Sequence, residues 1–446
     1  MQLPAGRKQA KHISAEAAAA LVTDGMWLDY GLAVGQPDVF DKALSSRSHE
    51  LKGVKIRSCL TLRPRRYHET DPSGENILSL SWHFSGYDRR QHDAGRCNYL
   101  PLNLGEWPDL YRRFIPPVDI AIVKCCPKDA KGFYNFSAAA AYLRALVETA
   151  KLVIVEVCSG SPYSCGQDNG VHESEVDFVI DGDGLPPVEL PNPAATEIDR
   201  KIAALIAAEV RDGSCIQIGI GGMPNAVCSS LRDASLKDLG VHTEMMVDGI
   251  VELIDAGAVN NSRKQVDTGK SVYTFAAGSR ALYKFIDHNP ALEIRAVDYT
   301  NLPHNIARND NVISVNSTGQ IDLQGQACSE SNGHRHFTGT GGQLNFVRGA
   351  YMSKGGKAFL CMPSTYDKDK SGQKKSRVVI DLPGGTIVTT PRTDTMYVVT
   401  EYGMVCLKGK SVAERAQAMI SIAHPDFREG LEREARDKGL VPRGFM

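Results

Sequence analysis

Glu244 is the residue of this chain whose type and setting best fit a reacting group. It lies in GVHTEM (240–245), between an apolar strand-like lead-in and DGIVELIDAG (248–257), which has the spacing of an amphipathic helix. Three roles suit such a glutamate: a helix-start residue, a ligand of a cofactor ribose, or a carboxylate that reacts. A reacting carboxylate would attack an electrophilic carbon and form a covalent intermediate.

A glycine-rich stretch, GIGGMP (219–224), precedes this glutamate and separates an apolar run from a helical one. Glycines there let backbone N–H groups face a ligand, and a helix N-terminus favours negative charge. A plain strand-to-helix turn is one alternative. A dinucleotide fingerprint is another, with Glu244 near the distance expected for its acidic residue. Pro224 occupies the place of the third glycine, which weakens that second alternative.

Two further segments carry groups that suit an anionic ligand. In TGTGGQLNF (338–346), Gly341 and Gly342 form a turn that either connects buried elements or presents a second set of amides. The basic loop KDKSGQKKSR (368–377) is either a solvated hairpin tip or a clamp for ligand phosphates, with Lys368 and Lys370 as candidate contacts.

The cluster RPRRYHETD (63–71) reads as a charged loop, or as a source of an arginine that binds a carboxylate through two hydrogen bonds. Arg63 is the candidate. The pair His334 and His336 has no acidic or thiol partner nearby, so we predict no metal site.

The bulk composition favours small-molecule partners and further copies of the chain. The 446 residues suggest two or three domains, with 42% hydrophobic and 23% charged residues. A net charge of −1 provides no excess of positive charge that would attract nucleic acid or an anionic membrane. The 11 cysteines include no C-x-x-C pair and indicate reduced thiols. Without a secretory signal or an apolar run of membrane-spanning length, the chain is predicted to be soluble and cytoplasmic.

Apolar strand-like runs alternate with helical patterns, which predicts α/β units around mostly parallel sheets. The Gly- and Pro-rich stretch DGDGLPPVELPNPA (181–194) reads as a linker. We therefore predict an N-terminal α/β domain over 1–185 and a C-terminal α/β domain over 195–446.

The two halves resemble each other, which predicts a duplication. DGMWLDYGLAVGQPDVFDKAL (24–44) matches DGSCIQIGIGGMPNAVCSSL (212–231), with the two pairs of glycines at an offset of 188 (213 − 25, 219 − 31). Continuing the match into the next strand at an offset of 187 places Arg57 opposite Glu244 (244 − 57). A guanidinium in one copy and a carboxylate in the other suggest that one copy was specialised, which favours a functional role for the glutamate.

Several motifs in order resemble one known family. GIGGMP, GVHTEM, GTGGQLNFVRGAYMSKGGK (339–357), VTEYG (399–403) and ISIAHPDFRE (420–429) are similar to the acetyl-CoA hydrolase/transferase family of class I CoA-transferases. The resemblance is closest to its 4-hydroxybutyrate and butyryl-CoA:acetate CoA-transferase branch and covers nearly the whole chain. It implies two related α/β domains with the active site at their junction. It also implies acyl-CoA and short-chain carboxylic acids as substrates, no permanently bound cofactor, and a homodimer or higher homo-oligomer.

The resemblance assigns a role to Glu244. The carboxylate attacks an acyl-CoA carbonyl and forms an acyl-glutamyl anhydride, and the released CoA thiolate converts it to a glutamyl-CoA thioester. An incoming acid then reverses both steps, which gives ping-pong kinetics. The same match implies further site residues. Those that contact CoA or an oxyanion are Gly219, Ile220, Gly221, Gly222, Met223, Gly341 and Gly342, and those predicted for the acyl pocket, in part from the duplicated turn, are Leu32, Val34, Gln36 and Arg63.

Two departures from the family pattern stand out. Asn345 occupies a position where Asp is expected. The arginines of residues 63–66 replace a more apolar stretch, which suggests an acid with a second carboxylate or a polar tail. Three other functions stay open: a hydrolase in which water resolves the glutamyl thioester, an NAD-dependent oxidoreductase that uses GIGGMP, and a non-catalytic CoA-binding protein.

Overall fold

The computed structural model describes residues 9–367 and 371–442, and its N-terminal half is built on one parallel sheet. The strand order is β1-β10-β8-β6-β2-β3-β4-β5, and every neighbouring pair is parallel. The strands are β1 (Lys11–His12), β2 (Trp27–Leu32), β3 (Val54–Cys59), β4 (Ile77–Ser81), β5 (Cys97–Tyr99), β6 (Ile120–Cys125), β8 (Leu152–Val157) and β10 (Phe178–Asp181). The central β6 is buried along its whole length, as expected for a strand covered on both faces.

The C-terminal half has a second sheet with the order β12-β11-β17-β22-β26-β27. Its pairs are parallel except the last, where β27 runs antiparallel to β26. The strands are β11 (Cys215–Ile218), β12 (Gly240–Val241), β17 (Val312–Ser317), β22 (Lys357–Cys361), β26 (Tyr397–Thr400) and β27 (Gly403–Cys406). Two short parallel pairs join β13 (Met245–Met246) to β15 (Phe275–Ala276) and β14 (Ser271–Tyr273) to β16 (Leu292–Ile294).

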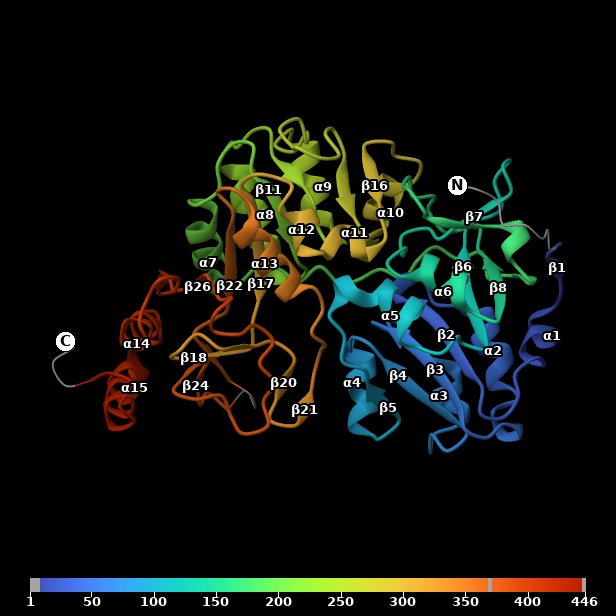
Figure 1. The fold of residues 1–446 in the computed structure, drawn as a ribbon, viewed down its shortest axis with the longest axis horizontal. Helices are drawn as coiled ribbons and strands as arrows, with labels where there is room; N and C mark the ends of the chain where they lie inside the picture. Colours follow the sequence, from blue (N-terminus) through green and yellow to red (C-terminus); the bar gives the residue numbers. More distant parts are fainter. Residues whose placement is uncertain (1–8, 368–370, 443–446) are drawn as a thin grey trace.

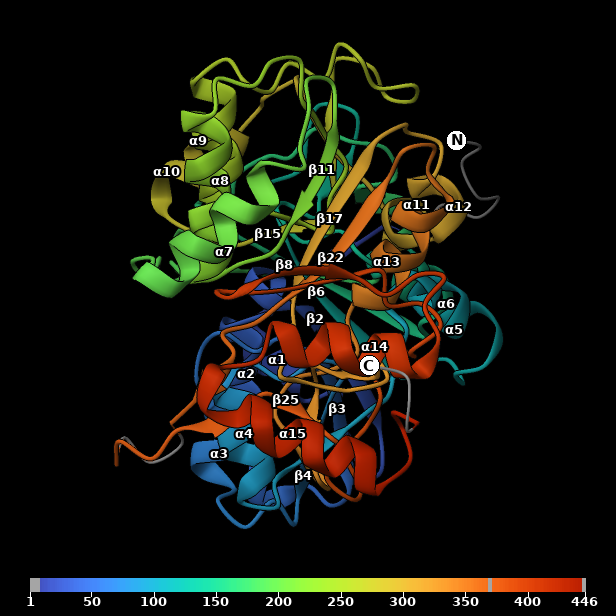
Figure 2. The ribbon, with the colours of Figure 1, turned by 90° about the vertical axis from the view of Figure 1, so that its left-hand side faces the viewer.

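Helices follow the strands of both sheets, as the alternating pattern predicts (Figures 1 and 2). The N-terminal half contains α1 (Ala15–Ala19), α2 (Val39–Ser45), α3 (Arg66–Thr70), α4 (Gly86–Asp93), α5 (Trp107–Arg113) and α6 (Leu143–Thr149). The C-terminal half contains α7 (Glu197–Ala207), α8 (Gly222–Asp233), α9 (Asp248–Asp255), α10 (Arg280–Ile286), α11 (Val297–Asn301), α12 (Pro303–Ile306), α13 (Gln343–Met352), α14 (Val412–Ser421) and α15 (Pro425–Asp437).

Small sheets of two or three strands complete the described structure. Figure 1 shows β18, β20, β21 and β24 below the second sheet. The N-terminal half adds β7 (Phe133–Asn135) and β9 (Gly170–His172), and the C-terminal half adds β18 (Gln320–Asp322), β19 (Ala327–Cys328), β20 (Ser331–Asn332), β21 (Arg335–His336), β23 (Thr365–Tyr366), β24 (Lys375–Ser376) and β25 (Val378–Val379). No helix in the described ranges is long and apolar enough to cross a membrane.

The two halves repeat one topology. The order β3-β2-β6-β8-β10 in the first sheet corresponds to β12-β11-β17-β22-β26 in the second. Hydrogen bonds repeat as well. The amide of Lys52 donates to the Asp24 carboxylate at 2.8 Å, and the amide of Lys237 donates to the Asp212 carboxylate at 2.8 Å. The α/β fold with mostly parallel sheets, predicted from the sequence, is therefore confirmed.

These repeated hydrogen bonds correct one detail of the sequence alignment. They set the offset of the second strand at 185 (237 − 52), whereas the alignment used 187. Cys59, not Arg57, thus corresponds to Glu244 (244 − 59 = 185), and the alignment was wrong by two residues. A shift of two keeps every side chain on the same face of a strand, so an apolar pattern alone does not detect it.

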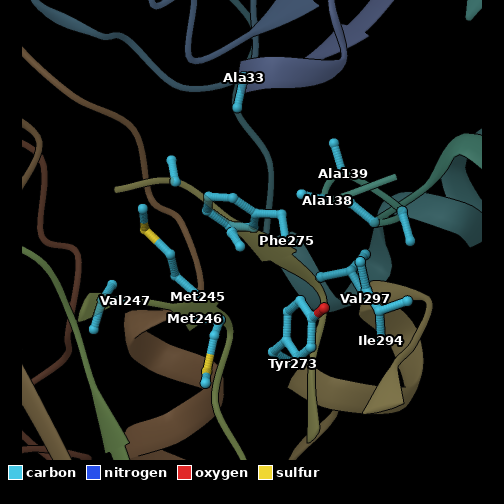
Figure 3. Close-up of a cluster of buried hydrophobic side chains, with 14 of the residues drawn as sticks. Ala33, Ala138, Ala139, Met245, Met246, Val247, Tyr273, Phe275, Ile294 and Val297 are labelled. Atoms are coloured by element: carbon cyan, nitrogen blue, oxygen red, sulfur yellow. The ribbon is translucent and has the colours of Figure 1, made fainter. Parts of the chain in front are cut away.

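The halves pack against each other around β15. The amide of Ala276 donates to the carbonyl of Ala138 at 2.8 Å, and that of Ala141 donates to the carbonyl of Thr274 at 3.2 Å. Figure 3 shows the apolar cluster at this junction, with Phe275 between Met245 and the alanines of the N-terminal half. The segment that carries Glu244 is therefore held by both halves.

Candidate active site

Glu244 lies at the junction, between the end of β12 and the start of β13. Its backbone carbonyl accepts hydrogen bonds from the amides of Thr274 at 3.0 Å and Phe275 at 3.3 Å. Burial raises the pKa of its carboxyl group to about 7, although hydrogen bonds from Asn301 and from the Gly342 amide act in the opposite direction. The group is thus divided between its acid and carboxylate forms near neutral pH, as a functional carboxylate often is.

Asn301 orients the carboxylate. Its side-chain Nδ2 donates to Glu244 Oε2 at 2.8 Å, while its Oδ1 accepts from the Thr300 hydroxyl at 2.8 Å. Because an ionised carboxylate only accepts hydrogen bonds, the Nδ2 end of the amide must face the glutamate, and the Thr300 hydroxyl then donates to the Oδ1 end. The carboxylate is therefore held at a defined position before any ligand binds.

Gly342 lies so close to Glu244 that only glycine fits. A Cβ atom at this position would lie 2.0 Å from Glu244 Oε2 and 2.2 Å from Asn301 Nδ2. The loop before it is tied to the buried Glu330, whose carboxylate accepts from the Thr340 hydroxyl at 3.0 Å and the Thr389 hydroxyl at 2.8 Å. This network keeps the Gly342 amide beside the carboxylate.

A cavity of about 530 Å³ opens in front of Glu244 and is lined by both halves. The second sheet contributes residues at the carboxyl ends of β11 and β17, among them Gln217 and Asn316. This is the place where open parallel sheets bind ligands, because neighbouring connections diverge there. The N-terminal half contributes mostly apolar side chains, including Leu32, Leu104 and Trp107.

The glycine-rich stretch 219–224 forms the turn between β11 and α8. Gly221 has a φ of 117°, which glycine adopts readily, and it precedes α8 with no side chain capping the helix. Ile220 is 49% exposed and borders both the main cavity and an adjoining hollow of about 350 Å³ that reaches Pro191, Pro193 and Asn225. The site thus continues outward along the free helix N-terminus, a setting that favours anions.

The structure brings six of the predicted residues to this cavity. Those that line it are Glu244, Gly219, Ile220, Gly341, Gly342 and Leu32. Gly221 borders the adjoining hollow, while Gly222 and Met223 form the first turn of α8. Lys368 and Lys370 lie outside the described residues.

Three residues predicted for the acyl pocket lie elsewhere. Val34 is buried in the turn after β2, and Gln36 is buried behind the cavity wall, where its Nε2 donates to the carbonyl of Cys59 at 3.1 Å. Arg63 forms an ion pair with Asp38 at 2.7 Å and is absent from the cavity lining. Asp38 also binds Arg65 and Lys124, so this cluster holds the N-terminal half together.

Sequence reasoning missed Asn301, Trp107 and His83. Asn301 follows Glu244 by 57 residues (301 − 244) and carries no motif, so only the folded chain joins them. His83 lines the cavity, where burial lowers its pKa to about 4 and keeps the imidazole neutral. Asn345, which stands where Asp is expected, has a structural contact. Its Oδ1 accepts from the amide of Gly105 at 3.1 Å, which links α13 to the turn just before α5, the helix that begins at Trp107.

The arrangement defines a class of enzyme: a duplicated α/β fold with a partly protonated glutamate in a cavity between its halves, beside backbone amides. Comparison with known proteins agrees. The family model of the acetyl-CoA hydrolase/transferase N-terminal domain matches residues 6–188, and that of the C-terminal domain matches residues 278–435. The chain belongs to this family.

Two relatives that match nearly the whole chain are named as CoA-transferases. The chain is 42% identical to the butyryl-CoA:acetate CoA-transferase of Anaerostipes caccae, over 96% of both proteins. It is 44% identical to the succinyl-CoA:cyclohexane-1-carboxylate CoA transferase of Geobacter metallireducens, over 94% of this chain and 93% of that protein. The crystal structure of RipA from Yersinia pestis matches with a TM-score of 0.88 at 36% identity, over 97% of this chain and 98% of that one. The CoA-transferase prediction therefore replaces the oxidoreductase alternative.

Proposed function

We propose that this enzyme transfers CoA between a short-chain acyl-CoA and a free carboxylic acid, with Glu244 as the covalent carrier. The observation that carries the proposal is the position of the glutamate: partly protonated near neutral pH, oriented by Asn301, and in contact with the Gly342 amide at the wall of a cavity. A carboxylate is a weak nucleophile but a good leaving group, so its acyl derivatives form and break reversibly. CoA transfer between thioesters of similar energy requires this reversibility.

The reaction proceeds through two intermediates. A carboxylate oxygen of Glu244 attacks the acyl carbonyl carbon, the C–S bond breaks, and an acyl-glutamyl anhydride and CoA thiolate result. The thiolate attacks the glutamyl carbonyl carbon, the bound acid leaves as a carboxylate, and a glutamyl-CoA thioester remains. A second acid repeats these steps in reverse order. The free enzyme therefore reacts with an acyl-CoA and the glutamyl-CoA enzyme with an acid, as in ping-pong kinetics.

Backbone amides stabilise the negative charge that each addition places on a carbonyl oxygen. We assign this role to the amides around Gly342 and the 219–223 loop. Losing one such donor typically reduces the rate on the order of 100-fold or more. The cavity and the adjoining hollow accommodate the reacting end of CoA and its arm, with Gly219, Ile220 and Gly221 along the path.

The dependence on an acceptor acid tests this function against hydrolysis. Acetyl-CoA is mixed with isotope-labelled acetate, and the label in the thioester and the free CoA are measured together. A transferase incorporates label into acetyl-CoA and releases little free CoA. Release of CoA at the same rate without any acid would instead support the hydrolase alternative, in which water attacks the glutamyl thioester.

Three further properties belong to the same proposal. We divide the chain into domains 1–185 and 195–446, and we expect a cytoplasmic homodimer or higher homo-oligomer. Light scattering of the purified protein measures the oligomeric state, and limited proteolysis between residues 181 and 197, where no helix or strand lies in the described structure, tests the boundary. Protection of that segment by CoA would further place the coenzyme near Pro191 and Pro193.

A further inference from the structure

His242 is a buried histidine two residues before Glu244, in the segment that joins β12 to β13. It is 1% exposed and is absent from the lining of the cavity. Its backbone amide donates to the Ile216 carbonyl at 3.2 Å, and the amide of Thr243 donates to the Val272 carbonyl at 2.9 Å. Hydrogen bonds to strands on both sides thus fix the backbone that carries the imidazole.

The imidazole binds a carbonyl at the end of a short helix. Its Nε2 lies 2.8 Å from the carbonyl oxygen of Thr300 in α11, and because a carbonyl oxygen only accepts, Nε2 carries the hydrogen. The last carbonyls of a helix need partners from outside it, and Pro303, three residues further on, has no N–H to donate. His242 supplies this partner.

A chain of three hydrogen bonds leads from the imidazole to the reacting carboxylate. His242 donates to the Thr300 carbonyl, the Thr300 hydroxyl donates to Asn301 Oδ1, and Asn301 Nδ2 donates to Glu244 Oε2, each at 2.8 Å. Because His242 and Glu244 belong to one backbone segment, the chain of hydrogen bonds closes into a ring. The end of α11, and with it the amide of Asn301, is therefore held at a fixed position relative to the carboxylate.

The imidazole is uncharged at neutral pH. Burial and the nearby charges of Lys264 and Arg308 lower the pKa of His242 to about 4, although the Thr300 carbonyl and Asp267 act in the opposite direction. Among the described residues, its Nδ1 has no hydrogen-bond partner, so a proton there would be buried without an acceptor. The side chain is thus suited to be a fixed donor, and not an acid or a base.

The duplicated fold does not itself require a histidine at this position. At the offset of 185, His242 corresponds to Arg57 in β3 (242 − 57), whose guanidinium lies over the Trp27 ring, 4.2 Å from its centroid. That half has Cys59 in place of Glu244 and so has no carboxylate to orient there. The histidine occurs in the copy that carries the glutamate.

We propose that His242 is a positioning residue for the reaction, which anchors the end of α11 so that Asn301 holds the Glu244 carboxylate ready for attack. This inference rests on the proposed function and deepens it by adding a residue that does not touch the substrate. Displacement of a reacting group by about 1 Å can reduce a rate on the order of 100-fold. We therefore expect removal of the donor to lower kcat/KM although the cavity itself is unchanged.

Two variants of the full-length enzyme test the donor. His242→Leu removes it, and kcat/KM for acetyl-CoA at pH 7 should fall at least tenfold, and on the order of 100-fold. The acid limb of its pH profile should move to higher pH, because the hydrogen bond that favours the ionised glutamate is weakened. His242→Gln carries an amide N–H that reaches about as far as Nε2, and it should stay within about threefold of wild type with an unshifted profile. Equal losses in both variants, or a loss in His242→Leu without a shift, would overturn the inference.

A combination of variants separates positioning from a general loss of structure. If His242 acts through Asn301, adding His242→Leu to Asn301→Ala should lower kcat/KM less than about threefold further, whereas losses that multiply would overturn the inference. His68→Leu is the matched control. It removes another buried histidine with a pKa of about 4, in α3 of the N-terminal half, and its pH profile should match that of the wild type.

Two further measurements keep the outcome unambiguous. If His242→Leu does not fold, His242→Asn takes its place, because its shorter amide does not reach the Thr300 carbonyl. The exchange of labelled acetate into acetyl-CoA by the wild type is measured alongside. Its absence would overturn the proposed function, whereas exchange in the wild type together with an unshifted profile in the variant without the donor would overturn this inference alone.

Discussion

The equivalent turns of the two halves are each followed by a helix, α2 or α8. They differ in which group accepts hydrogen bonds from the amides at the start of that helix. In the N-terminal half, the carboxylate of Glu156 accepts from the amides of Asp38, Val39 and Phe40 at 2.9–3.1 Å, so the start of α2 is filled from within. In the C-terminal half, Gly221 precedes α8 without a side-chain cap, and the strand equivalent to β8, β22, carries no acidic residue. One copy satisfies its own helix N-terminus with a buried carboxylate, whereas the other has no side-chain cap there.

The second difference concerns the two positions that the offset of 185 makes equivalent. Glu244 follows β12 in the C-terminal half, Cys59 ends β3 in the N-terminal half, and both line the same cavity. Burial raises the pKa of both groups. The glutamate still titrates near neutral pH, whereas the thiol stays protonated and is a poor nucleophile. Duplication thus supplied two equivalent positions, and only one carries a group suited to covalent catalysis.

The largest expected effect follows from replacing the two equivalent residues in turn. Glu244→Ala should lower kcat/KM for CoA transfer by about 10⁴-fold or more, because no covalent intermediate can form. Cys59→Ala should change it less than tenfold. Steady-state kinetics with acetyl-CoA and butyrate measure both. Similar losses in the two variants would contradict the assignment of separate roles.

A pair of glycines gives the next contrast. In Gly342→Ala, the new methyl group would occupy the space of Glu244 Oε2 and displace the carboxylate, so we expect a loss of at least about 100-fold in kcat. Gly219→Ala meets no atom within 4 Å and should lose about tenfold at most. Circular dichroism provides the check that both variants are folded.

Removal of the orienting amide should change the pH dependence. The hydrogen bond from Asn301 favours the ionised form of Glu244, so Asn301→Ala should raise the pKa of that group above about 7. Since only the carboxylate attacks, wild-type kcat/KM should fall as the pH drops below about 7, and in the variant this fall should begin at a higher pH. We expect a loss on the order of 10- to 100-fold at pH 7, partly recovered at pH 8.5. A variant with reduced activity and an unshifted profile would argue against this role.

The smallest effect on catalysis is expected from replacing Glu156, the carboxylate at the start of α2 in the N-terminal half. Glu156→Gln replaces an acceptor of three backbone amides by a group with one acceptor oxygen, and should lower the free energy of unfolding by about 2 kcal/mol. Denaturant unfolding measures the loss, and kcat at 25 °C should stay within a few-fold of wild type. A large loss of activity in the folded variant would show that both helix N-termini serve the reaction.

Much of the fold could be predicted from the sequence. Alternating apolar runs and helical patterns predict parallel α/β units, and the repeated glycines at an offset of 188 reveal the duplication. The offset of the next strand could not be fixed in this way, because a shift of two residues preserves the faces of a strand. The hydrogen bonds of Lys52 and Lys237 resolve it.

The site could be predicted only in part. Glu244, Gly219 and Gly342 are marked by glycine-rich turns or by their place beside a strand, which are local signals. Asn301 and Trp107 reach the cavity through long-range packing, and no local pattern marks them. Arg63 illustrates the opposite error: a conspicuous charge near the site is bound to Asp38 within its own half.

Intact-protein mass spectrometry tests the central claim most directly. The wild-type enzyme and Glu244→Gln are mixed briefly with acetyl-CoA, and the mass of the protein is recorded before and after acetate is added. We predict a CoA adduct on the wild type that maps by peptide analysis to Glu244, disappears with acetate, and is absent from the variant. An adduct on another residue, or CoA transfer by the wild type with no adduct under single-turnover conditions, would contradict the assignment of Glu244 as the covalent carrier.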